Sequence, residues 1–227
     1  MSDKILLSWS GGKDSVLALH NLLYLGGYKV AGLITTFTES TGTVGLHNVP
    51  IELIRDQADS LDLPLFEIGL TLNASNYEYE QRLLQLFENA KQTGISEVAF
   101  GDIYLASIRE YRDNLALKTR MKFHYPVWGQ DTAQLSREFI SRGYDAIVIA
   151  IQKDLIAPDM LGRIFDESFI GDLPLGVDVC GENGEFHTFV YDGPIFNKPI
   201  PFRTGARTVE KSRQGIDITM EYLEILP

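Results

Sequence analysis

Cysteine is nearly absent from this sequence of 227 residues, which contains only Cys180. A single thiol excludes an intramolecular disulfide framework. It also excludes a zinc or iron–sulfur site built from several cysteines. The cysteine content therefore fits a protein of a reducing compartment.

Long apolar runs are absent too. No stretch of the sequence approaches the ~20 apolar residues that a membrane-spanning helix needs. Residues 1–10 hold too short an apolar run for a signal peptide and lack the small-residue pattern of a cleavage site. We therefore expect a cytoplasmic protein with no membrane partner.

Basic residues are few, with 20 Lys and Arg against 31 Asp and Glu and a formal net charge of -11. Nonspecific binding to a nucleic-acid backbone needs a surface rich in Lys and Arg, so the charge argues against nucleic acid as a partner. What the chain does have is 44% hydrophobic residues, which is ample for a core. At ~150 residues per domain, its length fits one large or two smaller domains.

Short apolar runs alternate with helical patterns through the first half of the chain. Strands are predicted at residues 4–9, 29–37, 65–68, 98–100 and 124–127, and helices at 14–25, 50–61, 75–90 and 106–120. This alternation predicts an α/β fold with a parallel sheet flanked by helices. Ligands bind such sheets at the carboxyl ends of the strands.

The composition changes after Trp128. A helix at 132–141 and an apolar run at 146–151 precede a segment rich in proline and glycine. The tail predicts two strands, 206–212 and 216–226, joined near Gln214 and Gly215. We therefore expect two domains, 1–128 and a smaller α+β domain at 129–227, and the paired tail strands offer an edge for a homodimer.

The segment Ser8–Ser15 lies between the first predicted strand and the first predicted helix. The adjacent Gly11 and Gly12 let the backbone approach an oxyanion, and the helix amino terminus offers unpaired N–H groups. Hydroxyls and a lysine add donors, and Asp14 could hold Mg2+ against phosphates. The segment therefore predicts a phosphate cradle, with a capped tight turn as the alternative. It matches neither the P-loop nor the dinucleotide-binding pattern.

A second cluster of polar residues spans 177–196 and contains Gly181-Glu182-Asn-Gly184-Glu185-Phe-His187. Two glycines flanked by two carboxylates and followed by a histidine indicate a turn that can carry acid–base chemistry. The alternative is a charged hairpin turn in which His187 is a core residue.

Ser10–Ser15 resembles the Ser-Gly-Gly-x-Asp-Ser motif of the PP-loop ATP pyrophosphatases, the adenine nucleotide alpha hydrolase-like superfamily. With it, the second cluster resembles the Gly-Glu-x-Gly-Glu-(Phe/Tyr) element of the diphthine–ammonia ligase family. The resemblance covers residues 4–196 and includes Thr35-Thr36, Leu46–Pro50, Gln57-Ala58, Gly101–Ile103, Arg109-Glu110 and Pro126–Trp128. His187 replaces an acid that is common in the family, and Asn48 and Pro50 depart from its usual Gly and Arg. The Asn-Gly-Glu-Phe-His form is more similar to the ligase-related bacterial branch.

This resemblance implies a Rossmann-like (HUP-type) parallel sheet and an ATP-dependent amide ligase. A substrate carboxylate, small-molecule or protein-borne, would attack the alpha phosphate of ATP to give an acyl adenylate and pyrophosphate. Ammonia would then displace AMP. Residues 1–128 would be the ATP-binding PP-loop domain, and 129–227 the substrate and catalytic domain.

The candidate site residues follow from the motifs and the resemblance together. ATP binding is assigned to Ser8, Ser10, Gly11, Gly12, Lys13, Asp14, Ser15, Thr35, Thr36 and Arg109, and Mg2+ binding to Asp14. Catalysis is assigned to Asp14, Asp102, Glu182, Glu185 and His187. The alternatives are plain strand propensity for the two threonines, a turn carboxylate for Asp102, and a solvated helix face for Arg109.

Other functions stay open. Another adenylating reaction is an alternative, although the lack of a cysteine pair disfavours thiolation and the charge disfavours action on tRNA. A nucleotide-binding regulator of the universal-stress-protein type shares the fold but does no chemistry. Release of pyrophosphate distinguishes a ligase from a regulator.

Overall fold

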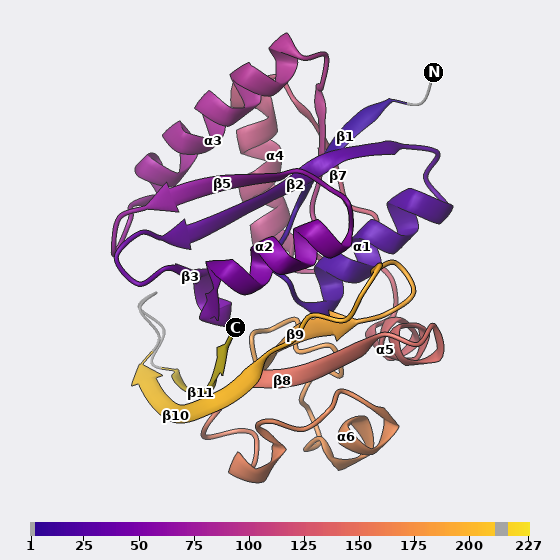
Figure 1. Cartoon of the computed structure of the whole chain (residues 1–227), viewed down its shortest axis with the longest axis vertical. Coiled ribbons are helices and arrows are strands. Elements are labelled where there is room, and N and C mark those ends of the chain that lie inside the picture. The colour runs from indigo at the N-terminus through magenta and orange to yellow at the C-terminus, as the bar shows by residue number, and fades with distance from the viewer. Residues whose placement is uncertain (1–2, 212–217) are drawn as a thin grey trace.

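The computed structural model describes residues 3–211 and 218–227. Two β-sheets lie one above the other with a layer of helices between them (Figure 1). The predicted turn near Gln214 and Gly215 falls outside the described residues. The change from the first sheet to the second comes between residues 124 and 145. The predicted domain boundary near residue 129 stays a prediction.

The first sheet has a parallel core in the order β5-β2-β1-β6-β7. Its strands are β1 (Lys4–Ser8), β2 (Lys29–Thr38), β5 (Leu65–Leu70), β6 (Glu97–Ala99) and β7 (Lys122–His124). The predicted α/β class with a parallel, Rossmann-like sheet is confirmed. The last strand lies two residues earlier than the prediction, since Pro126 cannot donate a backbone hydrogen bond to a ladder. Two short antiparallel strands, β3 (Thr43–Val44) and β4 (Val49–Pro50), extend the end of β2 and were not predicted.

Helices cover both faces of this sheet. The helices α1 (Lys13–Tyr24) and α2 (Ile51–Ser60) lie on one face, and α3 (Asn76–Gln92) and α4 (Ala106–Thr119) on the other (Figure 1). The strand period of two explains the arrangement. In β1, Ile5 and Leu7 face the core of α1 and α2, whereas Leu6 faces the core of α3 and α4.

The second sheet is antiparallel, in the order β10-β11-β8-β9. Its strands are β8 (Asp145–Gln152), β9 (Phe186–Asp192), β10 (Arg203–Lys211) and β11 (Thr219–Leu226). The short elements η1 (Gly45–His47) and η2 (Pro158–Met160) and the helices α5 (Thr132–Ser141) and α6 (Glu167–Asp172) complete the fold. This confirms a smaller α+β part after the parallel sheet.

The helix α1 is enclosed by both sheets. Eight of its 12 residues are buried, and its core cluster contains residues of β1 and of β9. A helix that is buried on most sides indicates a position inside the molecule. The phosphate-loop motif at its amino end therefore lies between the two sheets.

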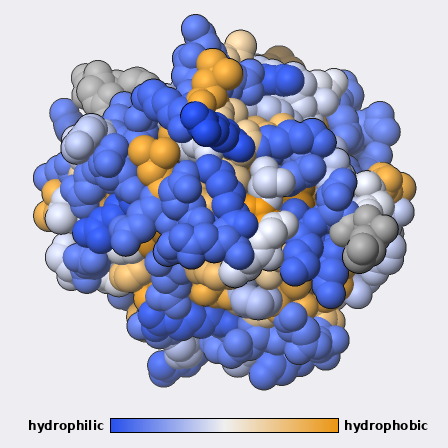
Figure 2. Space-filling model, turned by 90° about the horizontal axis from the view of Figure 1, so that it is seen from above, coloured by the Kyte–Doolittle hydropathy of each residue, from blue (hydrophilic) through white to orange (hydrophobic). Residues whose placement is uncertain are grey.

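The outer surface is largely polar. Figure 2 shows a mostly hydrophilic face on which hydrophobic residues appear in small, separate patches. Among the described residues, no helix has the length and apolar character to cross a membrane.

Candidate active site

The predicted phosphate loop joins β1 to α1 at the carboxyl edge of the parallel sheet. β1 lies between β2 and β6, where the chain order of the strands reverses, and ligands bind such sheets at this point. Gly11 has φ +79, and a Cβ there would lie 2.6 Å from Ile54 Cδ1 and 2.7 Å from Gln57 Oε1. Gly101, directly after β6, approaches the backbone of Asp14 so closely that a Cβ would lie 3.0 Å from its carbonyl carbon. The tight path of the loop thus requires glycine both in the loop after β1 and in the segment after β6.

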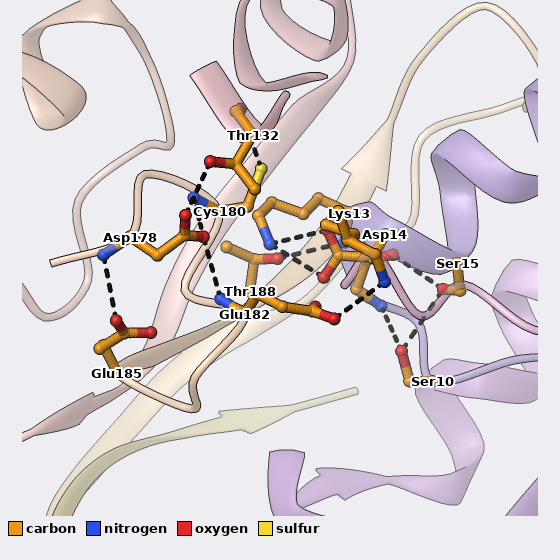
Figure 3. A network of polar contacts seen from close by, with 12 residues as sticks. Ser10, Lys13, Asp14, Ser15, Thr132, Asp178, Cys180, Glu182, Glu185 and Thr188 are labelled. Carbon is orange, nitrogen blue, oxygen red and sulfur yellow. Dashed lines mark hydrogen bonds and ion pairs between the residues drawn. The ribbon is translucent and has the colours of Figure 1, made fainter. Parts of the chain in front are cut away.

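The hydroxyl groups of Ser10 and Ser15 lie beside each other in the loop (Figure 3). Ser10 Oγ accepts from the Gly12 N–H at 3.3 Å and lies 3.4 Å from Ser15 Oγ. Ser15 Oγ donates to the Gly12 carbonyl at 2.8 Å. The helix α1 begins after Gly12, and the positive end of its dipole at this amino terminus favours an anion.

Lys13 turns toward the second sheet. Its side chain is 3% exposed, and Nζ lies 2.9 Å from both carboxylate oxygens of Asp14. The ammonium also lies over the rings of Phe165 and Phe186, 5.9 and 5.5 Å from their centroids. Burial lowers the pKa of Lys13, but Asp14 and other acidic neighbours outweigh it and the net pKa is raised. Burial raises the pKa of Asp14, partly opposed by Lys13.

The acidic turn before β9 is held together by two of its own carboxylates. Glu185 is 4% exposed and accepts from the Asp178 N–H, the Asn183 N–H and the Asn183 amide at 2.9–3.0 Å. Asp178 accepts from the N–H groups of Cys180 and Glu182 at 2.9 and 3.1 Å. Glu185 therefore shapes the turn and has little free accepting capacity.

Glu182 connects this turn to the first sheet. Its carboxylate accepts from the N–H groups of Ile103 and Tyr104, just after β6, at 2.8 and 3.2 Å. Burial raises the pKa of Glu182, as does the nearby charge of Asp14, while the two backbone hydrogen bonds lower it. The structure thus brings Asp14 and Glu182, 168 positions apart in sequence, into one polar network (Figure 3).

Two histidines meet beside this network. His187 on β9 lies against His47 of η1, with ring centroids 4.4 Å apart. Burial and the positive charge of Lys13 lower the pKa of His47 to about 4. Burial, His47 and Lys13 lower the pKa of His187 well below its usual value. Both rings are therefore neutral at neutral pH.

Thr35 lies near the carboxyl end of β2. Its side chain is 2% exposed, and its hydroxyl has no hydrogen-bond partner among the described residues. Thr36 and Ser8 are half-buried at the same edge of the sheet. A buried hydroxyl without a partner is unusual and fits the polar group of a ligand.

Comparison with known proteins gives the family. The model for the diphthamide synthase N-terminal domain matches residues 3–123, and the model for the C-terminal domain matches residues 131–223. The chain belongs to the diphthamide synthase family. This confirms the resemblance that the two motifs predicted.

Curated relatives of the family share about a quarter of their residues with this chain. Diphthine–ammonia ligases of Danio rerio and Homo sapiens are 28% and 27% identical, over 84% of this chain and 83% and 79% of their own lengths. That of Schizosaccharomyces pombe is 26% identical over 92% of this chain but 37% of its own length. A solved U34-tRNA thiolase from Methanococcus maripaludis matches 61% of this chain and 56% of its own, with 16% identity and a TM-score of 0.39. At this level of similarity, the thiolase gives no information on the reaction of this chain.

Two further residues that the family resemblance selected lie at the β6 and β7 edge. Asp102 pairs with Arg112 at 2.5 and 3.2 Å. Arg109 instead stacks on Tyr125 and Trp128, 4.8 and 4.6 Å from their ring centroids. The structure does not join Arg109 to the phosphate loop by any contact among the described residues. Its role in ATP binding therefore stays a prediction.

The sequence analysis assigned no role to three residues that shape the candidate active site. Asp178 organises the acidic turn, Thr188 Oγ1 accepts from the Lys13 N–H at 3.2 Å, and Gln57 holds the Gly11 carbonyl at 3.1 Å. Asp178 had a local signal, because an aspartate two residues before a turn often accepts backbone hydrogen bonds. Thr188 and Gln57 showed no local signal for these contacts, since their partners are 175 and 46 positions away, although Gln57 belongs to the positions of the family resemblance.

Proposed function

We propose that this protein is an ATP-dependent ligase that converts a carboxylate to an amide with ammonia. One observation carries the proposal: the acidic turn of the second sheet folds onto the phosphate loop, with Glu182 beside Asp14 and two neutral histidines nearby. Membership of the diphthamide synthase family supports the same chemistry. Residues 1–128 would bind ATP, and 129–227 would supply the turn and the histidines.

The first step is adenylation. In this proposal the Ser10–Ser15 loop holds the phosphates, and the unpartnered Thr35 hydroxyl binds a polar group of the nucleoside. A carboxylate oxygen of the acceptor attacks the alpha phosphorus, and the bond to pyrophosphate breaks. Loop N–H groups and hydroxyls stabilise the charge that moves onto the pyrophosphate oxygens.

A magnesium ion fits the site through Asp14. The described residues contain no group of three or more His, Cys, Asp or Glu that could hold a metal by itself. Mg2+ is commonly held by one or two carboxylates together with substrate phosphates, so a single aspartate at the loop suits it. When bound, Mg2+ would neutralise phosphate charge.

The second step is amidation. Ammonia attacks the carbonyl carbon of the acyl adenylate, a C–N bond forms, and the bond to AMP breaks. In this proposal the nitrogen then loses a proton, which the neutral imidazole of His187 accepts. Glu182, whose pKa burial raises, is the second candidate acceptor. Asp102 would orient the acceptor through its pair with Arg112.

The acceptor is a carboxylate, either a small molecule or a group on a protein. The curated relatives are named for diphthine, so diphthine on a protein is the first acceptor to test. His187, the proposed proton acceptor, stands where an acid is common in the family. Because of this change, carboxylates other than diphthine are the second group of acceptors to test.

The test is a product assay with ATP, an ammonium salt and a candidate carboxylate. The proposal predicts one AMP and one pyrophosphate per amide formed, and no amide when ammonium is omitted. Pyrophosphate without ammonium would show adenylation alone. Formation of ADP and phosphate would contradict the proposal, and so would ATP binding without cleavage for every acceptor tried.

A further inference from the structure

Gln57 is a buried amide that contacts three separate parts of the fold. It lies on α2 and is 0% exposed. Its Nε2 donates to the carbonyls of Gly11 and Val190 at 3.1 and 2.6 Å, and its Oε1 accepts from Trp9 Nε1 at 2.8 Å. Both amide protons are therefore used, and the bond from Trp9 settles which end of the amide faces the loop.

These contacts orient the peptide group between Gly11 and Gly12. The Gly11 carbonyl accepts from Gln57 and also from the Val190 N–H at 3.0 Å, so it is held toward α2 and β9. In a planar trans peptide, the N–H points opposite to the carbonyl. The Gly12 N–H is thereby turned away from Gln57 and toward Ser10 Oγ, to which it donates at 3.3 Å.

The same amide attaches the loop to the strand that carries the histidine. Val190 lies on β9, three residues after His187 and two after Thr188. Thr188 Oγ1 accepts from the Lys13 N–H. The phosphate loop therefore contacts β9 at Gly11 and at Lys13. At the first of these contacts, Gln57 donates to the carbonyls of both Gly11 and Val190.

We propose that Gln57 is a positioning residue for the phosphate loop, which turns the Gly12 N–H toward the phosphates and fixes β9 against the loop. The inference rests on the proposed function, because it requires that the loop binds ATP. It goes beyond that function because it gives a role to a side chain of α2, which is remote from the motif in sequence. That role is to orient the backbone that binds the phosphates.

The test compares ATP with adenosine in calorimetric titrations of the wild type and Gln57→Met. Methionine keeps the length of the side chain but donates to neither carbonyl. We expect the Kd for ATP to rise about tenfold, equivalent to ~1.4 kcal/mol, and the Kd for adenosine to stay within about twofold. A general disturbance of the fold would weaken both ligands alike. In the product assay the KM for ATP should rise more than kcat falls.

Two further variants keep the test decisive. Gln134→Met removes a glutamine hydrogen bond on the exposed face of α5 and is the matched control, with no expected change for either ligand. If Gln57→Met does not fold, Trp9→Phe decides, because it removes the bond that orients the amide and keeps an aromatic ring in the core. It should weaken ATP about threefold and spare adenosine, as expected for one lost hydrogen bond.

The two proposals fail in different ways. A wild-type protein that binds no ATP would contradict the proposed function. A wild type that binds ATP, with ATP affinity unchanged in Gln57→Met or, where that variant does not fold, in Trp9→Phe, would overturn the role of Gln57. Equal loss of ATP and adenosine affinity would overturn it as well.

Discussion

Gly11 is required for two independent reasons, its left-handed backbone and its crowded surroundings. Alanine at φ +79 costs about 1–2 kcal/mol, and a Cβ 2.6 Å from Ile54 Cδ1 adds ~1–3 kcal/mol of overpacking. We therefore expect Gly11→Ala to lower the free energy of unfolding by about 2–5 kcal/mol and to abolish ATP binding. Urea unfolding and calorimetry measure the two effects.

Gly94 provides the control for that substitution. It has φ +78, but nothing lies within 4 Å of a Cβ built there. Gly94→Ala should show only the backbone cost of about 1–2 kcal/mol and should bind ATP normally. Equal destabilisation by the two substitutions would contradict the crowding at Gly11.

The paired histidines predict a dependence of stability on pH. The pKa of His47 falls from its ordinary value of 6.5 to about 4 in the folded chain, and that of His187 is lowered too. As the pH falls, the two histidines are therefore protonated in the unfolded chain before they are protonated in the folded chain. Their contribution to the free energy of unfolding is full above about pH 6.5 and is lost as the pH falls toward 4. Unfolding free energies at about pH 7 and pH 5 measure this loss.

The matched protein for this measurement carries His47→Gln and His187→Gln together. It should lose less stability than the wild type between the two pH values. The raised pKa values of Asp14 and Glu182 act in the opposite direction, but both proteins contain these carboxyls and their effect largely cancels in the difference. Parallel losses in the two proteins would rule out neutral histidines.

At the scale of elements, the acidic turn at 178–185 depends on Glu185 for its shape. Three hydrogen bonds to this one carboxylate hold the turn that presents Glu182 to Ile103 and Tyr104. We expect Glu185→Ala to slow amide formation about 100-fold, since a displacement of ~1 Å at a catalytic group has effects of this size. ATP affinity should change less than about threefold. Product assay and calorimetry on the same sample test this.

Glu167 is the control for the turn, because it is an exposed carboxylate on α6. Glu167→Ala should form amide at the wild-type rate. Unchanged amide formation in Glu185→Ala would show that the turn does not position the reacting groups. Loss of ATP binding in that variant would instead place Glu185 in the nucleotide site.

Local elements were predictable because their causes are local. The phosphate loop, the helix after it and the run of β8 follow from glycines, periodicity and apolar residues within a few positions of one another. The two-residue strands β3 and β4 were missed because so short a segment shows no period. The contact of Glu182 with Ile103 spans 79 positions and depends on how the two sheets meet, which no local pattern records.

Side-chain direction was the least predictable part of the site. The sequence placed Lys13 in the loop but could not show that its ammonium faces Asp14 and two aromatic rings, Phe165 before α6 and Phe186 of β9. Arg109 had an expected partner in phosphate, and the structure gives it the rings of Tyr125 and Trp128. Both directions are set by residues that come later in the chain.

For the whole molecule, the main hydrophobic core includes residues of both sheets. One continuous cluster contains Trp9 of the phosphate loop, Ile54 of α2 and Phe189 of β9. The buried amide of Gln57 and the Lys13–Thr188 contact also join the two parts. Neither side can be exposed to water without opening the core of the other. We therefore expect the two predicted domains to unfold as one cooperative unit.

The positions of the tryptophans allow this cooperativity to be measured. Trp9 and Trp128 both precede residue 129, so their fluorescence reports on the first part of the chain. Phe189→Ala lies in the second part and should lower the free energy of unfolding by about 3–5 kcal/mol through the cavity it leaves. If the molecule is one unit, the fluorescence and far-ultraviolet circular dichroism curves in urea shift together. The control Leu175→Ala, at a fully exposed side chain, should shift neither curve by more than ~0.5 kcal/mol. A fluorescence transition that stays in place while the dichroism splits into two steps would show that the sheets unfold independently.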